Sequence, residues 1–362
     1  MSGGGEKSAL RPAGPPAVAP FLDRALRLAA RGEGHTRPNP PVGAVVVRDG
    51  RVVGEGYHRR AGARHAETAA IADARRRGLS TDGAALYVTL EPCSRPGRVG
   101  ACTDAIVAAG IREVVYAVPD PNPANRGRAK RVLGRAGVAC SCVATDMRRL
   151  VAHPRTHDEA RLGDLLRASA RLIAPFAKHV LTGLPLVTVK LAMSLDGRIC
   201  DVSGDAKWIS SAASRKLTGR DRARVDAIMV GAETVRRDDP SLLSHGKRNG
   251  DLIRVVVSRS GRLPGDAQVF SDGKNRTLVF DDARTALGEL GRMGCLHVLC
   301  EGGLELARSL ADEGLVDRWR LITAPIVIGT RPISEACRFE VLESGFSDLL
   351  AGDRDALYAR RT

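Results

Sequence analysis

Four residues of the sequence have the types and spacing that support metal-dependent chemistry. His65 and Glu67 lie two residues apart, and Cys93 and Cys102 follow further along the chain. One imidazole and two thiolates supply three ligands to a tetrahedral zinc ion, and a catalytic zinc site keeps its fourth position for a water. Glu67 lies close to His65 in the sequence, but the zinc ion does not need it as a ligand. Its carboxylate can take a proton from that water and pass it to a leaving amine.

His65, Cys93 and Cys102 allow two other interpretations, a chance occurrence and a structural zinc site. Such a site has four protein ligands, and no fourth Cys or His lies near these three in the sequence, so the catalytic interpretation is favoured. A His-x-Glu motif followed by Pro-Cys and a second cysteine is typical of zinc-dependent nucleobase deaminases, in which the glutamate is the acid and base. We predict that His65, Cys93 and Cys102 bind Zn²⁺ and that Glu67 is catalytic.

The elements around these residues predict a small α/β domain. Apolar spacing favours helices over residues 21–36, 66–78 and 103–110 and strands over 85–93 and 111–118. Two further strands within residues 40–62 are joined at Asp49 and Gly50, a typical hairpin turn. This order gives a sheet covered by helices. His65 and Cys102 then lie where two helices start, and the positive helix ends favour thiolates.

A chain of 362 residues is long enough for two domains. Residues 1–20 are rich in Gly and Pro and predict a disordered tail. We expect a deaminase domain over 21–144, a linker and docking helix over 145–183, and a second domain over 184–362. In the second domain the pattern favours strands over 187–191, 227–235 and 253–258 and a helix over 214–226. The Glu301-Gly302-Gly303 turn suits the approach of a cofactor pyrophosphate, although any tight turn favours glycine.

Composition and charge narrow the class of protein. The net charge is +15, but aromatic residues make up only 3% of the chain, so no stacking surface for nucleic acid is predicted. No run of about 18 apolar residues and no signal peptide occur, so we expect no membrane segment and a cytoplasmic protein. The eight cysteines are expected to be reduced thiols.

The motifs together resemble a known family, the bifunctional riboflavin-biosynthesis deaminase/reductases. The resemblance rests on PNPPVGAV at residues 38–45, GEGYH at 54–58, HAE at 65–67, YVTLEPC at 87–93 and DPNP at 120–123. The eight residues between Cys93 and Cys102 are this family's own spacing. The resemblance implies an α/β fold with an N-terminal cytidine-deaminase-like domain followed by a dihydrofolate-reductase-like domain that uses NADPH. It also implies a phosphorylated pyrimidine substrate and a homo-oligomer, such as a dimer.

The resemblance also implies site residues. In the deaminase domain the expected substrate contacts are Asn39, His58, Arg98, Asp120 and Asn122. Each has a simpler alternative, because Asn39 can form a turn, Asp120 and Asn122 can form Asx turns, and His58 can be a satisfied surface histidine. In the second domain the residues expected near cofactor or substrate are Lys190, Asp196, Trp208, Arg222, Thr234, Asp238 and Glu301. Trp208 can instead be a core aromatic, and Arg222 can pair on its helix surface.

Departures from the family pattern leave two functional hypotheses close to each other. Glu305 lies in the first turn of the expected phosphate-binding helix, where it repels a pyrophosphate, and His245 replaces a phosphate-binding arginine. Other departures are Arg95, Ile173, Ala206, Ser258-Arg259, Leu304 and residues 99–101 and 127–129.

The first hypothesis is zinc-dependent hydrolytic deamination of a phosphoribosylamino-diaminopyrimidinone in riboflavin biosynthesis, followed by NADPH-dependent reduction of the ribose. The second is a paralogue with a working deaminase and a degenerate reductase-like domain, which serves a specialised flavin-like or azapteridine pathway. A nucleic-acid-editing deaminase is a more distant third, against which the cysteine spacing, the few aromatics and the second domain all speak.

Overall fold

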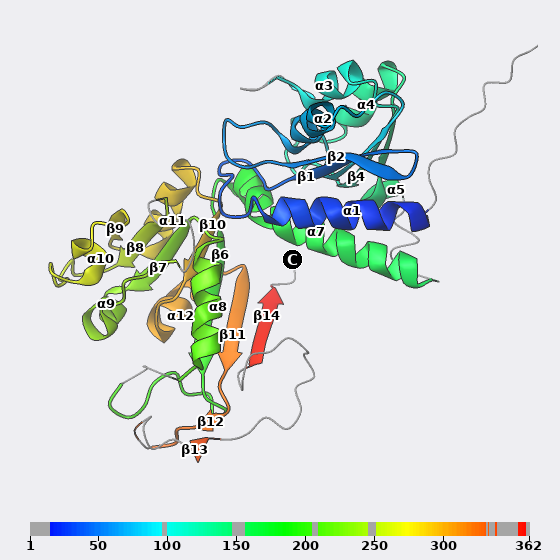
Figure 1. The fold of residues 1–362 in the computed structure, drawn as a ribbon. Helices are drawn as coiled ribbons and strands as arrows, with labels where there is room; N and C mark the ends of the chain where they lie inside the picture. The colour runs from blue at the N-terminus through cyan, green and yellow to red at the C-terminus, as the bar shows by residue number, and fades with distance from the viewer. Residues whose placement is uncertain are drawn as a thin grey trace, which may run out of the picture. The chain divides into compact units, whose positions relative to one another are not determined.

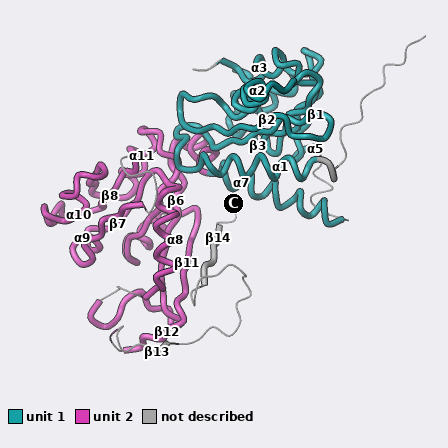
Figure 2. Tube along the Cα trace, in the orientation of Figure 1, with its two compact units in different colours: residues 1–174 teal, residues 175–362 magenta. Residues whose placement is uncertain are grey.

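The computed structural model describes residues 15–95, 100–146, 156–204, 209–244, 251–330, 332, 337–338 and 354–359. The chain divides into two compact units, residues 1–174 and residues 175–362 (Figure 2). The boundary falls inside helix α7, His157–Thr182, so one continuous helix contributes to both units. None of the helices in the described ranges combines the length and the apolar character that a membrane crossing requires.

The first unit is built on a five-stranded sheet in the order β2-β1-β3-β4-β5. Strand β1 pairs antiparallel with β2 and β3, and β3, β4 and β5 are parallel. The strands are β1 Gly43–Arg48, β2 Arg51–Tyr57, β3 Ala85–Leu90, β4 Glu113–Val118 and β5 Ala139–Cys142. Asp49 and Gly50 both have positive φ angles, 50° and 72°, as a tight hairpin turn requires. The predicted hairpin is therefore confirmed.

Helices cover both faces of this sheet (Figure 1). Helices α2, α3 and α4 enclose one buried cluster, which includes Ile71, Ile106 and Leu133. Helix α1 and the first part of α7 enclose the other cluster, which includes Leu22 and Leu162. The helices are α1 Pro15–Ala30, α2 Ala66–Arg76, α3 Cys102–Ala108, α4 Arg128–Arg135 and the short α5 Val143–Asp146.

Helix α2 lies directly on strand β2 because two glycines face it. A Cβ atom on Gly54 would lie 2.3 Å from the carbonyl oxygen of Ala70, and one on Gly56 would lie 2.5 Å from the nitrogen of Ala70. Neither distance leaves room for a side chain. The helix backbone therefore contacts the strand backbone, which only glycine permits at both positions.

The predicted disordered tail ends earlier than we expected. Helix α1 begins at Pro15, so residues 15–20 are helical and not part of a tail. Proline is tolerated in the first helical turn, where its missing N–H has no helical partner. Val18 and Ala19 are 1% and 2% exposed and pack with Leu22, so burial of these side chains stabilises the early start.

The second unit is built on a seven-stranded sheet in the order β14-β11-β6-β10-β7-β8-β9. All neighbouring strands are parallel except β11 and β14. The strands are β6 Leu186–Met193, β7 Ala227–Gly231, β8 Ile253–Val257, β9 Thr277–Phe280, β10 His297–Cys300, β11 Arg318–Thr323 and β14 Arg354–Ala359, with a separate pair β12 Ile326–Val327 and β13 Cys337–Arg338.

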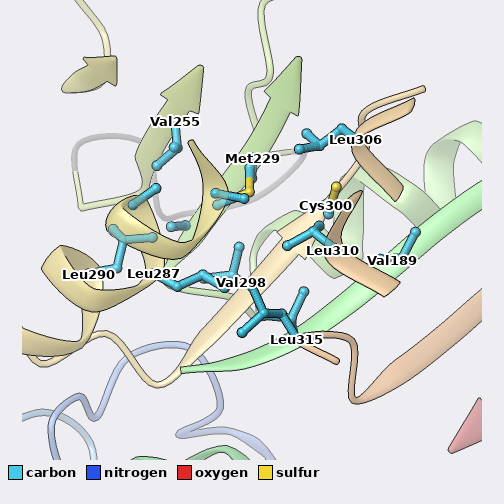
Figure 3. Close-up of a cluster of buried hydrophobic side chains, with 14 of the residues drawn as sticks. Val189, Met229, Val255, Leu287, Leu290, Val298, Cys300, Leu306, Leu310 and Leu315 are labelled. Atoms are coloured by element: carbon cyan, nitrogen blue, oxygen red, sulfur yellow. The ribbon is translucent and has the colours of Figure 1, made fainter. Parts of the chain in front are cut away.

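Helices α11 and α12 pack against this sheet through a large apolar core (Figure 3). Leu287 and Leu290 of α11 and Leu310 of α12 lie in one buried cluster with strand residues such as Met229 and Val298. The helices are α8 Ala212–Arg222, α9 Ala232–Asp238, α10 Gln268–Ser271, α11 Ala283–Arg292 and α12 Leu304–Asp312.

One predicted strand of this unit is too long. We expected a strand over 227–235, but β7 ends at Gly231, and the following residues form helix α9. Glu233 in the first helical turn binds Arg236 and Arg237, which lie three and four residues further on. Acidic residues in the first turn and ion pairs at these spacings favour a helix. Thr234 and Asp238 are therefore helical residues.

Candidate active site

The three predicted metal ligands come from three different elements and converge. His65 is the residue that precedes helix α2, Cys93 follows strand β3, and Cys102 is the first residue of helix α3. His65 Nδ1 lies 3.5 Å from the Sγ of Cys93 and 3.3 Å from the Sγ of Cys102, and all three ligand atoms lie within 4.8 Å of one another. Among the residues that the structure describes, this is the one cluster able to hold a metal ion.

The geometry and chemistry of these atoms fit zinc. Zinc binds histidine nitrogen at about 2.0 Å and thiolate sulfur at about 2.3 Å, and tetrahedral angles then place nitrogen and sulfur about 3.5 Å apart. Hydrogen bonds from Cys102 and His65 lower the pKa of the Cys93 thiol to about 4, and the shared hydrogen bond raises the pKa of Cys102. Zinc binds cysteine as the thiolate, so metal binding would release a proton that remains on either sulfur.

Glu67 lies in the first turn of α2 beside this cluster and is 4% exposed. Burial raises the pKa of its carboxyl to about 7, and the charge on Cys93 adds to the effect. A carboxyl with a pKa near neutral both accepts and releases protons readily. Glu67 therefore has the position and the acidity of a proton-transfer group.

Asn39 and His58, two of the predicted substrate contacts, are brought together. The Nδ1 of His58 lies 3.1 Å from the carbonyl oxygen of Arg64, so it carries a proton and donates it. Its Nε2 then accepts from the Asn39 amide nitrogen at 3.1 Å. Burial lowers the pKa of His58, which keeps the ring neutral. The ring centroids of His58 and His65 lie 5.2 Å apart in an edge-on arrangement. Asn39 and His58 therefore lie beside the metal cluster.

Asp120 and Asn122 lie in a loop after strand β4. The Oδ1 of Asp120 accepts the N–H of Asn122 at 2.8 Å, and the Oδ1 of Asn122 accepts the N–H of Ala124 at 3.0 Å. Both residues therefore make the Asx turns that we considered as the simpler alternative. Burial raises the pKa of Asp120, and the charges of Glu91 and Cys93 contribute to the increase, so the loop lies close to the metal cluster. Arg98 lies outside the described residues.

Two residues that the sequence analysis missed hold this loop in place. The buried carboxylate of Glu91 accepts hydrogen bonds from the loop, and Asn125 bonds both Ser94 and Asp120. Glu91 was visible only as a letter of the YVTLEPC motif. Asn125 carries no signal in the sequence, because its partners lie up to 33 residues away.

The second unit contains a cavity of about 910 Å³ at the carboxyl ends of β7, β8, β9 and β10. Such strand ends are the usual ligand-binding edge of a parallel sheet. The predicted residues Thr234 and Asp238 line this cavity, and so does Glu305. The N-terminus of helix α12 opens on it at Gly303, where no side chain caps the first helical N–H groups. Uncapped helix N-termini bind phosphate groups.

Arginine side chains add positive charge to the lining of this cavity. Arg236 and Arg237 both form ion pairs with Glu233. Arg259, an exposed residue that follows β8, makes no ion pair with any residue in the described ranges. Arg259 is therefore the lining arginine most available to a negatively charged ligand, whereas Glu305 opposes such a ligand.

The other predicted residues of this unit form two separate groups. The guanidinium of Arg222 donates two hydrogen bonds to the carboxylate of Glu301, at 2.6 and 3.0 Å. Burial lowers the pKa of nearby Lys190, while the charge of Glu301 opposes that effect. Asp196 instead accepts the N–H groups of Ile328 and Gly329 in a turn. Trp208 and His245 lie outside the described residues.

Comparison with known proteins assigns each unit to a class. Residues 18–118 match the model of the cytidine and deoxycytidylate deaminase zinc-binding region, and residues 185–344 match the RibD C-terminal domain. Together with the geometry above, these matches define a zinc-dependent deaminase joined to a reductase domain, and they confirm the predicted fold class.

Relatives that match along most of the chain narrow the class to a family. The riboflavin biosynthesis protein RibD of Escherichia coli is 34% identical over 346 residues, which cover 86% of this chain and 88% of the relative. RibD of Bacillus amyloliquefaciens is 36% identical and covers 85% of both chains. The crystal structure of a diaminohydroxyphosphoribosylaminopyrimidine deaminase/5-amino-6-(5-phosphoribosylamino)uracil reductase from Thermotoga maritima has a TM-score of 0.78, 31% identity and coverage of 94% and 98%. The chain belongs to the RibD family.

Membership of this family corrects one of the two hypotheses. The chain is an enzyme of riboflavin biosynthesis with a deaminase and a reductase activity, with Zn²⁺ and NADPH as its cofactors. The alternative of a degenerate reductase-like domain is not favoured, because the matches run through both units. That hypothesis gave too much weight to single substitutions such as Glu305. The cavity and the uncapped N-terminus of helix α12 are both present in spite of this residue.

Proposed function

We propose that the first unit hydrolyses the 2-amino group from a phosphoribosylamino-diaminopyrimidinone and that the second unit then reduces the ribose of the product to ribityl. The observation that carries the proposal is the convergence of His65, Cys93 and Cys102 around one point beside Glu67. The substrate is the one printed in the name of the Thermotoga maritima enzyme, whose chain matches this one nearly end to end.

In the first unit each residue has a distinct role. The zinc ion would be held by His65, Cys93 and Cys102, and it would act as a Lewis acid that activates a water. Glu67 takes the proton from that water and delivers it to the departing amine, for which its pKa near 7 is well suited. Asn39 and His58, from one side, and Asp120 and Asn122, from the loop after β4, contact the pyrimidine and its phosphoribosyl group. We assign Arg98 to the same substrate group.

In the second unit the cavity binds NADPH, which supplies a hydride to the opened ribose. The N–H groups at the start of α12 and the guanidinium of Arg259 hold its phosphates, and Thr234 and Asp238 contact the rest of the cofactor. Arg222 and Glu301 form an ion pair, and Lys190 lies close enough for the charge of Glu301 to affect its pKa. Glu301 precedes the cavity-lining residue Gly303 by two positions in the sequence. We assign Lys190, Arg222, Glu301, Asp196 and Trp208 to the substrate side.

A two-stage assay tests the proposal. Purified protein is first incubated with the diaminopyrimidinone ribosylamine phosphate without NADPH, and ammonia release is measured. NADPH is then added, and its consumption is followed by absorbance. Ammonia release in the first stage and NADPH oxidation in the second are expected. Absence of ammonia release from zinc-loaded protein would contradict the deaminase assignment, and NADPH oxidation that needs no deaminated product would contradict the order of the two reactions.

The same proposal includes a homodimer that acts in the cytoplasm on small molecules and not on nucleic acid. The cysteines whose side chains the structure describes are free thiols, as a reducing compartment favours. Light scattering coupled to gel filtration checks the dimer, and a mass of about 38.5 kDa would contradict it. A tRNA or single-stranded DNA probe should show no binding with a steep salt dependence.

A further inference from the structure

Glu91 is a buried carboxylate that the deaminase chemistry does not use. It follows strand β3, is 3% exposed, and lies two residues before the zinc ligand Cys93. Its oxygens accept hydrogen bonds from the backbone N–H groups of Asp120 at 3.2 Å, Gly127 at 3.0 Å and Ala129 at 3.1 Å. A buried charge requires compensation of this kind. The carboxylate therefore binds both ends of the loop that carries Asp120 and Asn122.

The N-terminus of helix α4 supplies part of this compensation. Gly127 precedes the helix, and Ala129 is its second residue, so two of the three donors belong to the first helical turn. Negative charge is stabilised at the start of a helix. The third donor, the N–H of Asp120, lies at the other end of the loop. One carboxylate thus fixes the separation between Asp120 and helix α4.

Asn125 connects the same loop to the segment that contains Cys93. Its Oδ1 accepts from both the N–H and the hydroxyl of Ser94, each at 3.0 Å. Its Nδ2 donates to the Oδ2 of Asp120 at 2.8 Å and, at 3.5 Å, to the carbonyl oxygen of Pro92. The side chain is 6% exposed, so these bonds are shielded from water. The loop after β4 and the loop after β3 are therefore held together by one carboxamide.

We propose that Glu91 and Asn125 are positioning residues of the deaminase, which hold the loop of residues 120–127 against the Cys93 segment so that Asp120 and Asn122 meet the pyrimidine at the metal. This inference rests on the proposed function of the first unit. Neither side chain hydrogen-bonds a ligand atom of His65, Cys93 or Cys102. Loss of either residue should therefore weaken substrate binding more than it weakens metal binding.

The amide of glutamine cannot replace the carboxylate of Glu91. Three N–H donors converge on its two oxygens, and a Gln side chain places an NH₂ group where one of these acceptors was. At least one backbone donor then faces another donor and loses its partner. Either Asp120 or the start of α4 must move, although the shape of the side chain is unchanged.

The test compares Glu91→Gln and Asn125→Ala with a matched control in the full-length, zinc-loaded protein. The control is Asp226→Asn in the second unit, where Asp226 is also 3% exposed and accepts the N–H groups of Leu296 and His297 at 2.8 and 3.1 Å. For each protein, kcat and KM of ammonia release, zinc per chain and thermal unfolding are measured. Both variants of the first unit should raise KM by roughly tenfold or more, the scale of one lost charge-assisted hydrogen bond, with a smaller fall in kcat and with zinc retained.

Each outcome decides the proposal. The control should lower the unfolding temperature without changing KM. If Glu91→Gln does not fold, Asn125→Ala alone decides, because it removes the connection between the two loops while the carboxylate of Glu91 keeps its three N–H donors. Unchanged KM in both variants, or loss of zinc instead of a KM effect, would overturn the positioning role. Failure of the unmodified protein to release ammonia would contradict the proposed function, which is a different result.

Discussion

Two buried carboxylates, one in each unit, have opposite pKa shifts. Glu67 is surrounded by the metal cluster, and burial raises its pKa to about 7. The side chain of Glu301 is 8% exposed, and burial alone would raise its pKa as well, but the charge and hydrogen bonds of Arg222 outweigh that effect and lower it. The two pKa shifts differ because, of these two carboxylates, only that of Glu301 accepts two hydrogen bonds from an arginine, Arg222. Glu67 is suited to moving a proton, and Glu301 to carrying a fixed charge.

The units also differ in how their site residues are gathered. In the first unit, ligands from three elements meet within 4.8 Å. In the second, the predicted residues divide among a cavity, a buried ion pair and a turn. A metal ion needs particular atoms at fixed distances, whereas a dinucleotide is held largely by backbone N–H groups and the shape of a cavity. Substitutions in the two units should therefore have effects of different size.

Removal of two metal ligands should produce the largest effect. In the variant Cys93→Ala with Cys102→Ala, only His65 remains, so we expect zinc content to fall from about one per chain to near zero and ammonia release to be lost. NADPH-dependent reduction of added deaminated product should continue in the second unit. Elemental analysis and the two assays check this. Cys140→Ala, which removes a free thiol of the same unit, is the control, and zinc retained in the double variant would contradict the assigned ligands.

Substitution of the proton-transfer group should have the next largest effect. Glu67→Gln keeps the size of the side chain but cannot move a proton, so kcat of ammonia release should fall by roughly a hundredfold or more while zinc content is unchanged. Glu301→Gln removes a similarly buried carboxylate from the other unit and should leave ammonia release as it was. An active Glu67→Gln enzyme would mean that the proton moves by another route and that the raised pKa of Glu67 has no catalytic role.

Substitutions in the cavity of the second unit should have weaker effects on cofactor binding, because we propose that several groups share the binding of NADPH. Arg259→Ser removes the lining arginine without an ion pair among the described residues, and KM for NADPH should rise about three- to tenfold, since an exposed charge-assisted bond is worth less than a buried one. Arg236→Ser, whose guanidinium already binds Glu233, is the comparison and should change KM less. Equal effects of the two variants would show that Arg259 has no special contact.

The smallest effect is expected from the carboxylate at the start of α12. Glu305→Thr removes a negative charge from the helix end where we propose that the cofactor phosphates bind, so NADPH affinity should improve by about two- to fivefold, the range of helix-end charge effects. Glu313→Gln near the far end of the same helix is a control of equal charge change. Titration of NADPH at two salt concentrations measures both, and the gain should shrink at high salt. Weaker binding after Glu305→Thr would mean that this carboxylate contacts the cofactor favourably.

The parts of the fold and site that could be predicted were those with local signals. The hairpin at Asp49 and Gly50 follows from two adjacent residues, and the metal ligands follow from short motifs of characteristic residue types; the structure contains both. The start of α1 at Pro15 depends on burial of Val18 and Ala19 against a sheet that comes later in the chain, which local composition does not reveal. The end of β7 at Gly231 was missed because Thr234 and Val235 are β-branched residues, which favour a strand, although they lie in the helix.

The missed site residues show the same limit. Asn125 bonds Pro92, Ser94 and Asp120, and two of these partners lie more than 30 residues away in the sequence. Thr234 and Asp238 were expected near the cofactor and do line the cavity, whereas Asp196 accepts hydrogen bonds from the N–H groups of Ile328 and Gly329. Contacts between distant segments depend on how loops fold back, which local sequence patterns do not reveal.

The glycines of strand β2 have a consequence for the tolerance of this enzyme to change. Gly54 and Gly56 have no side chains with which to bind a ligand, yet they set the distance between the sheet and the helix whose first turn carries Glu67. Any larger residue there would displace the proton-transfer group away from its metal, so a saturation mutagenesis screen for deamination should score both positions as intolerant as the ligands themselves. Variants inactive at Gly54 or Gly56 would then have lost the close spacing between the backbones of strand β2 and helix α2. Engineering of the substrate pocket must therefore leave these two positions unaltered.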